Sequence, residues 1–481
     1  MTDNLASAEP RNSVGTLERQ HAETRSDRPT VFASILLGGA RTGALIHELR
    51  RINELANRGY QCHIFWAFER SYDVKIDPRI KQHWLFHCGR FAGPLHYFGN
   101  VIGRTIENRS GKLMSYVGRA RAQEMVRRYA PGLVRYELNR TVAGISRGLS
   151  HDKPLINEFT RKLQRAGVTH VLPMLGILAP FAKAARDNGA DIKYSVTLQG
   201  YELYVNLGDD AYRQAALNCI RDAILSSDYA PVTFTRWYAE RIEREVGIPA
   251  EDFSLIHPGV HTEGPMAVDK ARQLVQAELS IKADTPIITY LGRQDSEKGI
   301  DLLLYAARLL QKCGHKFQVV VCGPETFGSY RKTCEDIAGH LEIPILFTGF
   351  VSSEVRQAVM QCSRCVVYPS IHGEPFGMVP VEAMAVGTPA VVPDDGGVAE
   401  LVHQGPLRGG LNFRCWDSGD LATQLERLLT DETLHSELAG NAREVASHYS
   451  ISKEVDLTLE HLGLVTQTST IRPELQPQVS A

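Results

Sequence analysis

Short apolar runs alternate with helix patterns in two separate series along the chain. The first series has apolar runs at 31–37, 61–66, 168–173, 192–198 and 229–232. The second series has runs at 287–291, 317–322, 365–369 and 389–393. Such runs between helix patterns are typical of strands in parallel sheets that helices cover on both faces. We therefore predict an α/β protein with two Rossmann-like, doubly wound domains.

The ends of the chain and one internal segment lack this periodicity. Both ends are polar and are expected to be disordered, and the segment 254–265, rich in proline and glycine, is the expected linker. The predicted organisation is a disordered arm (1–29), an N-terminal Rossmann-like domain (30–265), a C-terminal Rossmann-like domain (266–450), a last helix (451–465) and a disordered tail (466–481). Ligands of such sheets bind where the strands end, so we expect a cleft shared by the two domains.

Composition adds limits on partners and compartment. The 53 basic and 55 acidic residues nearly cancel, which gives no indication of a nucleic-acid partner. Nine dispersed cysteines, the lack of a signal-peptide pattern and the lack of an apolar run of spanning length predict a cytoplasmic protein with free thiols. We interpret Cys362 and Cys365 as small apolar side chains at a helix-to-strand junction rather than as a redox or zinc motif.

The segment 104–147 departs from this neutral charge balance. It has ten basic and three acidic residues, a net charge of +7, with apolar residues interleaved. One interpretation is a solvated helical face. The other is a basic amphipathic surface that contacts an anionic membrane or a phosphate-bearing acceptor, which would place the protein at the inner face of the membrane.

The segment 371–402 carries the most informative chemistry. Glu374 follows a predicted strand, Glu382 lies about one turn into the next helix, and the helix start between them holds Phe376, Gly377 and Met378. Free N–H groups at a helix start favour a phosphate or a sugar hydroxyl. Two carboxylates around such a turn suit a ligand rich in hydroxyls with an anion in the middle, which describes a nucleotide diphosphate sugar.

This segment resembles the signature of the retaining GT-B glycosyltransferases, especially the large family four. The matching positions are Glu374, Phe376, Gly377, Glu382, Gly387, Pro389, Gly396, Gly397 and Glu400. The resemblance covers roughly 30–464. It implies a GT-B fold with an acceptor domain followed by a donor domain, and a last helix that crosses back to the first domain. It also implies that Glu374 holds donor-sugar hydroxyls, that Glu382 holds ribose hydroxyls, and that backbone at 376–378 contacts sugar and phosphate.

The loop YLGRQDSEKG, residues 290–299, places Arg293 and Lys298 directly after a predicted strand. Two cations in a strand-to-helix loop are well placed to neutralise a diphosphate. The loop resembles the family loop whose Arg and Lys hold the donor diphosphate. We predict that Arg293, Lys298 and Glu374 are the catalytic residues, with the two cations stabilising the charge that grows on the leaving phosphate.

Four weaker signals complete the predicted donor site. Gly38 and Gly39 resemble the glycine loop that closes over the donor phosphate in the family. Gln199 stands where many relatives have histidine, and we expect it to hydrogen-bond a sugar hydroxyl rather than to act as a base. Phe350 and Val351 resemble the base-contacting turn of the family, and Gly323 is expected to line the same pocket.

The predicted function is transfer of a sugar from a nucleotide diphosphate sugar to a glycan, lipid-linked or small-molecule acceptor, with retention of configuration. We expect no metal and no cofactor, because Arg293 and Lys298 supply the positive charge and no D-x-D lies at a plausible strand end. Two alternatives remain open. One is an inactive nucleotide-sugar-binding protein on the same fold, and the other is a nucleotide-sugar epimerase.

Overall fold

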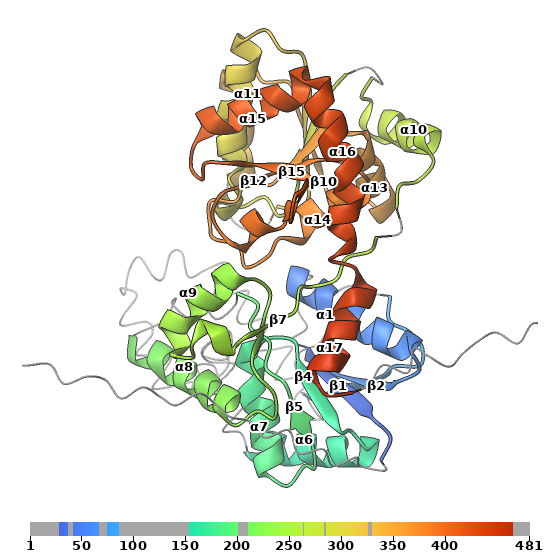
Figure 1. Ribbon diagram of the computed structural model, residues 1–481, viewed down its shortest axis with the longest axis vertical. Helices are drawn as coiled ribbons and strands as arrows, with labels where there is room; N and C mark the ends of the chain where they lie inside the picture. The colour runs from blue at the N-terminus through green and yellow to red at the C-terminus, as the bar shows by residue number, and fades with distance from the viewer. Residues whose placement is uncertain are drawn as a thin grey trace, which may run out of the picture.

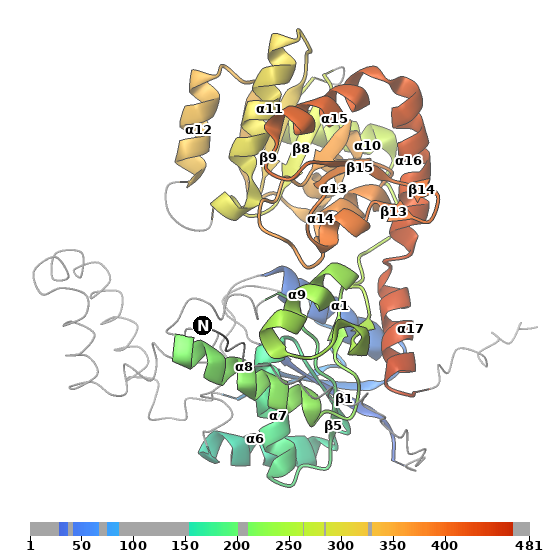
Figure 2. The same ribbon diagram turned by 60° about the vertical axis from the view of Figure 1, so that its left-hand side comes forward.

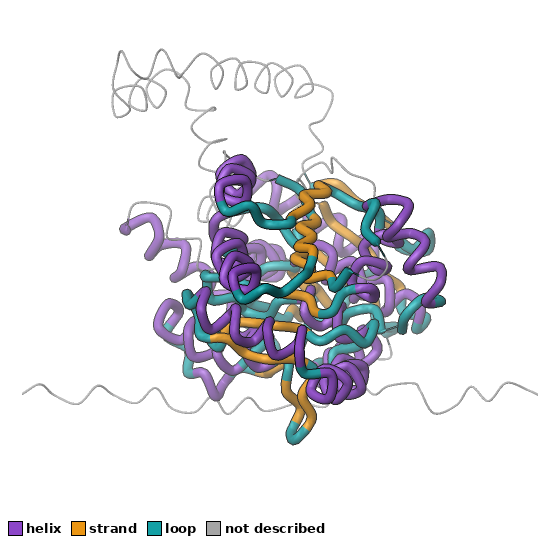
Figure 3. Tube along the Cα trace, turned by 90° about the horizontal axis from the view of Figure 1, so that it is seen from above, coloured by secondary structure: helices purple, strands orange, loops and turns teal. Residues whose placement is uncertain are grey.

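The computed structural model describes residues 28–36, 42–66, 75–85, 153–200, 210–262, 264–282, 285–325 and 330–464. These residues form two lobes joined by a narrow waist (Figure 1). Helices lie on both sides of the strands when the molecule is seen along its long axis (Figure 3). Gly38, Gly39, the basic segment 104–147 and the predicted terminal arm and tail lie almost entirely outside the described residues, so the predictions made for them stay predictions.

The N-terminal lobe is built on a five-stranded parallel sheet. Its strand order is β3 (Lys81–Trp84), β2 (Gln61–Trp66), β1 (Val31–Leu36), β4 (His170–Pro173) and β5 (Lys193–Tyr194). Every residue of β1 is buried, as expected for a central strand that helices cover on both faces. The connecting helices are α1 (Gly43–Asn57), α6 (Lys153–Ala166), α7 (Ala179–Asp187), α8 (Asp210–Leu225) and α9 (Arg236–Val246). The short strands β6 (Val232–Thr233) and β7 (Ser254–Leu255) pair in parallel beside this sheet.

The C-terminal lobe is built on a six-stranded parallel sheet. Its order is β10 (Ile345–Gly349), β9 (Gln318–Cys322), β8 (Ile287–Leu291), β11 (Cys365–Val367), β12 (Ala390–Pro393) and β15 (Gly410–Phe413). Its helices are α10 (Val268–Leu279), α11 (Ile300–Lys312), α12 (Tyr330–His340), α13 (Ser353–Cys362), α14 (Met378–Ala385), α15 (Ser418–Thr430) and α16 (Glu432–Ser447). Both sheets have the doubly wound order of a Rossmann domain, which confirms the predicted fold class.

The chain crosses between the lobes twice, and the two crossings are paired. The N–H of Val260 donates to the Tyr449 carbonyl at 2.8 Å, and the N–H of Ile451 donates to the Val260 carbonyl at 3.3 Å. After the second crossing, α17 (Ile451–His461) packs against α1 in the N-terminal lobe (Figure 2). Buried side chains of α17 thus join the core of a domain that begins more than 400 positions earlier, and they tie the end of the chain to its start.

Candidate active site

The strand order of the C-terminal sheet brings two predicted site loops together. Strands β8 and β11 are neighbours, although β9 and β10 lie between them in the sequence. The chain reverses its direction of sheet growth between these two strands, and their carboxyl ends open the crevice in which doubly wound sheets bind ligands. The loop after β8 carries Arg293 and Lys298, and the loop after β11 carries Glu374. The fold therefore places the three predicted catalytic residues at one point.

Lys298 and Glu374 form an ion pair at this point. Only 11% of the Lys298 side chain and 15% of the Glu374 side chain are exposed. Burial, and next the Arg293 guanidinium, lower the pKa of Lys298 to about 8, while Asp295 and Glu297 oppose this shift. The Lys298 ammonium is thus paired with a carboxylate, a negative charge like the one it would meet on a diphosphate. It loses its proton more easily than an exposed lysine does.

The two loops are also joined by main-chain contacts. The N–H of Ile371 donates to the Glu297 carbonyl at 3.1 Å, and the Ser370 hydroxyl donates to the same carbonyl at 3.2 Å. Gly299, at φ 65°, passes so close to the Pro369 carbonyl that any side chain there would collide with it. The glycine in the sequence EKG is therefore required by the packing of one loop on the other.

Arg293 is the more open of the two cations. Its side chain is 43% exposed and pairs with Asp295 at 2.7 Å, while its carbonyl accepts a hydrogen bond from the Tyr290 hydroxyl at 2.5 Å. The buried Tyr290 ring fixes the loop backbone, and the guanidinium remains free to change its ion-pair partner when an anion arrives.

The loop around Glu374 is held by the paired glycines that the sequence motif contains. The N–H of Gly397 donates to the Glu374 carbonyl at 2.7 Å. A side chain at Gly396 would approach the Glu374 backbone within 2.9 Å, and one at Gly397 would collide with the Pro375 carbonyl. These glycines let the 396–397 backbone lie directly on the 374–375 backbone, which orients the carboxylate.

Helix α14 begins at Met378 and points its N-terminus at this loop. Gly377 is the residue before the helix, at φ 98° and ψ 90°. Among the described residues, the N–H groups of Phe376, Gly377 and Met378 donate no turn or loop hydrogen bond. They are available to an anion or a hydroxyl. The Phe376 side chain itself is buried between Phe234 and Tyr449, so its ring anchors the loop.

Glu382 lies one turn into α14, and its carboxylate is held by two arginines from different lobes. Arg50 of α1 donates from Nη2 to Oε1 at 2.8 Å, and Arg356 of α13 pairs with Oε2. The Glu382 side chain is only 9% exposed. Neither arginine was predicted from the sequence. Both lie in ordinary amphipathic helix patterns that give no sign of a site.

The N-terminal lobe supplies a second wall beside Glu374. The Thr235 hydroxyl, which caps α9, donates to the Pro375 carbonyl at 2.8 Å. Gly200, at φ 109°, lies against the Pro375 ring, where a side chain would come within 2.7 Å. The neighbouring Gln199 is buried and donates from Nε2 to the Met174 carbonyl at 2.5 Å. Gln199 therefore directly precedes Gly200, the residue of the N-terminal lobe that contacts Pro375 next to Glu374.

A further cross-lobe contact was also not predicted. The Trp237 indole donates to Asp395 at 3.2 Å, and its main-chain N–H donates to Glu400 at 3.1 Å. The ring covers Gly373, where a side chain would collide with it. Asp395 and Glu400 flank the paired glycines, so this contact closes the outer edge of the same loop cluster.

The predicted base-binding residues lie at the ends of the next strands. Gly323 follows β9 at φ 139° and accepts from Gln294 Nε2 at 2.7 Å, while its own Cα packs on the Gly292 carbonyl. Phe350 follows β10 and is 68% exposed, and Val351 is half-buried. Phe350 thus lies at the carboxyl end of the edge strand β10.

No metal centre and no membrane-spanning helix is found in the described part of the chain. Within it, no three His, Cys, Asp or Glu side chains gather as a metal site would require. The helices described there are too short or too polar to cross a bilayer.

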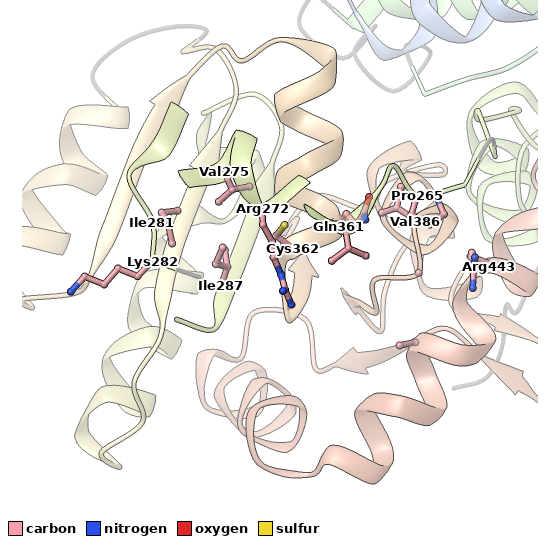
Figure 4. A pocket seen from close by; sticks show the side chains of 13 residues that line it. Pro265, Arg272, Val275, Ile281, Lys282, Ile287, Gln361, Cys362, Val386 and Arg443 are labelled. Atoms are coloured by element: carbon pink, nitrogen blue, oxygen red, sulfur yellow. The ribbon is translucent and has the colours of Figure 1, made fainter. Parts of the chain in front are cut away.

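A cavity of about 410 Å³ lies elsewhere in the C-terminal lobe (Figure 4). Val275, Ile281 and Ile287 contribute apolar lining, and Arg272 and Arg443 lie near it. It borders the start of β8 and the turns that lead into β11 and β12, so it lies at the edge where the strands begin. None of the predicted site residues lines it.

Comparison with known proteins agrees with this geometry. Residues 272–445 match the family model described as Glycosyl transferases group 1. An alpha-D-kanosaminyltransferase of Streptomyces kanamyceticus is 28% identical over 260 residues, which cover 53% of this chain and 64% of the relative. A D-inositol 3-phosphate glycosyltransferase of Gordonia bronchialis is 31% identical over 230 residues, which cover 46% of this chain and 48% of the relative. The chain thus matches about half to two thirds of the length of these relatives.

Solved structures share the whole fold at low sequence identity. Anabaena HepE in complex with UDP has a TM-score of 0.66 at 16% identity, with 90% of this chain and 100% of that chain covered. Sucrose-phosphate synthase of Thermosynechococcus elongatus has a TM-score of 0.64 at 19% identity, with 90% and 98% covered. The likeness to these structures shows the fold, and the family model matches most of the C-terminal lobe.

Proposed function

We propose that this chain is a GT-B glycosyltransferase, which its match to the group 1 family model over residues 272–445 and its fold support, and that it transfers a sugar from a nucleotide diphosphate sugar to an acceptor hydroxyl. The observation that carries the proposal is the meeting of Arg293, Lys298 and the N-terminus of α14 at the carboxyl ends of β8 and β11. Two cations and a helix N-terminus make an anion site, and a carboxylate beside it suits sugar hydroxyls.

The proposed chemistry is substitution at the anomeric carbon of the donor. The bond from that carbon to the β-phosphate oxygen breaks, and the acceptor oxygen forms the new bond. Arg293 and Lys298 stabilise the charge that develops on the departing diphosphate. The acceptor proton passes to an oxygen of that diphosphate. Glu374 is paired with Lys298, and a diphosphate that binds this lysine would release the carboxylate to hold sugar hydroxyls.

Retention and independence from metal belong to this proposal. The departing phosphate leaves from the face on which the acceptor attacks, so the product keeps the donor configuration. The positive charge that a metal would bring is supplied by the two loop cations. Gln199 on the opposite lobe contacts the sugar as a hydrogen-bonding group that carries no titrating proton.

We place the acceptor on the N-terminal lobe. One matched relative, the D-inositol 3-phosphate glycosyltransferase, is named for a phosphate ester of a small polyol. A phosphate-bearing acceptor agrees with the basic segment 104–147, whose contact with an anionic membrane or such an acceptor remains a prediction from the sequence.

A thermal-shift screen of nucleoside diphosphates and their sugars tests the proposal. A ligand at one hundred times its dissociation constant adds about 2.7 kcal/mol to the free energy of unfolding. We expect one nucleoside diphosphate and its sugar to raise the melting temperature, and the Lys298→Met variant to lose most of that shift. No shift with UDP, GDP, ADP or their common sugars would contradict the proposal.

A further inference from the structure

Helix α1 of the N-terminal lobe and α14 of the C-terminal lobe face each other and are in contact through side chains. Gly43 and Arg50 are two turns apart and share one face of α1, while Met378 and Glu382 are one turn apart on α14. A side chain at Gly43 would lie 3.2 Å from Met378 Cε, and Arg50 Nη1 lies 3.9 Å from Met378 Sδ. The contact therefore joins one face of α1 to one face of α14.

Arg50 and Glu382 form the polar centre of this contact. Arg50 Nη2 donates to Glu382 Oε1 at 2.8 Å, and the two side chains are 14% and 9% exposed. Burial lowers the pKa of Arg50, which shows that its charge depends on partners for stabilisation. A guanidinium buried to this degree needs an ionised partner, and Glu382 of the opposite lobe provides one.

The Glu382 carboxylate is fixed from two sides by this arrangement. Arg50 holds one oxygen from the N-terminal lobe, and Arg356 holds the other from α13 of the C-terminal lobe. An ionised carboxylate has about four acceptor directions, so two remain for further donors. With Arg356 alone, the carboxylate would be free to rotate about its remaining torsion.

We propose that Arg50 is a positioning residue of the donor site: from the opposite lobe, it orients the Glu382 carboxylate so that its two remaining acceptor directions meet the nucleotide ribose hydroxyls. This inference rests on the proposed function and on the role in ribose binding that the family resemblance implies for Glu382. It adds that ribose recognition is completed only when the lobes close. A nucleotide on the C-terminal lobe alone would meet a carboxylate held from one side.

The test compares a nucleoside diphosphate with its analogue that lacks both ribose hydroxyls. Dissociation constants of UDP and 2′,3′-dideoxy-UDP are measured by calorimetry on the full chain, with GDP and ADP pairs in case UDP does not bind. The variants are Arg50→Met, Arg50→Lys and Glu382→Gln. Arg58→Met is the matched control, because Arg58 directly follows the same helix and pairs with Asp456 of α17, away from Glu382.

Wild type and Arg58→Met should prefer UDP over the dideoxy analogue by at least about tenfold, since a hydrogen bond to a charged group is worth that much. Arg50→Met should reduce this preference to less than about threefold, chiefly by weakening UDP. Arg50→Lys should lie between them, because lysine keeps the charge but loses the planar fork. A structural role alone would weaken both nucleotides equally.

Three results would overturn the inference. If Arg50→Met keeps the preference while Glu382→Gln loses it, Glu382 binds the ribose without Arg50, and the proposed function stands. If Arg50→Met binds UDP more tightly than wild type, Arg50 blocks the site instead of shaping it. If wild type binds none of the nucleoside diphosphates, the inference and the proposed function fail together.

Discussion

Replacement of Lys298 by methionine removes a buried charge at the point where β8 and β11 diverge, while it nearly keeps the length of the side chain. The charge on the leaving phosphate is greater in the transition state than in the bound donor, so a cation there raises turnover more than it raises affinity. The loss of one well-aimed electrostatic contact costs about 2.7–4 kcal/mol, which is about 100-fold to 1000-fold in kcat. We expect Lys298→Met to fall in that range.

Two further variants distinguish the loss of the Lys298 charge from the effect of an unpaired Glu374 carboxylate and from the loss of an ordinary ion pair. Lys298→Met leaves Glu374 without its partner, and a stranded carboxylate could disturb the site by itself. The double variant Lys298→Met/Glu374→Gln removes that charge, and we expect it to remain at least 100-fold slower than wild type. The matched control is Lys270→Met, which breaks the exposed Lys270–Glu354 pair in the same lobe and should change kcat less than about threefold.

The assay is steady-state release of the nucleoside diphosphate at saturating donor, with melting temperatures recorded for every variant. Since a partly buried ion pair is lost, a somewhat lower melting temperature is expected for Lys298→Met, and the variant must be folded at the assay temperature. A folded Lys298→Met enzyme with kcat within threefold of wild type would refute the assignment. The diphosphate would then bind elsewhere.

Three more predictions follow from the same structure. Because the pKa of Lys298 is lowered to about 8, kcat/KM for the donor should fall as pH rises through about 8, whereas kcat at saturating donor should stay constant to higher pH. A flat kcat/KM profile from pH 7 to 9.5 would count against a role for protonated Lys298. Arg293→Ala should reduce kcat about 100-fold with little change in melting temperature, since its side chain is 43% exposed in a loop, and a change below threefold would leave it as surface charge. Burial, and next Lys193, lower the pKa of His170 to about 4, so below about pH 6.5 the unfolded chain binds a proton that the folded chain does not bind. Between pH 7 and pH 5 this difference lowers the free energy of unfolding by about 2 kcal/mol. Denaturant unfolding of His170→Phe should show that much less pH dependence than wild type.

The fold could be predicted from the sequence because the strands are short, apolar and buried on both faces. The apolar runs 61–66 and 287–291 are strands with those bounds, and most others differ by a residue or two at their ends. The run 229–232 shares only Val232 with β6. The run 192–198 is an exception. Only Lys193–Tyr194 pairs as a strand, because the chain then leaves the sheet to reach Gln199 beside the opposite lobe.

Proximity within the C-terminal site was also open to prediction from the sequence. Arg293, Lys298 and Glu374 follow strands of one sheet, and carboxyl ends of adjacent parallel strands meet at one edge. Their assigned roles remain predictions. The cross-lobe contacts had no local signal. Arg50 and Glu382 are 332 positions apart, and only the packing of α1 on α14 brings them together. The same holds for Thr235 and Trp237, whose contacts depend on how the two lobes sit.

We propose that this protein cleaves a nucleotide sugar at the anomeric carbon and that the transferred sugar keeps its configuration. The most direct measurement is proton and phosphorus NMR of the donor that binds in the thermal-shift screen, incubated with the protein and no acceptor. We expect slow release of the nucleoside diphosphate and a free sugar that first appears as the anomer present in the donor. A donor that stays intact would indicate a binding protein, an epimerised sugar still joined to its nucleotide would indicate an epimerase, and release of the opposite anomer would contradict retention.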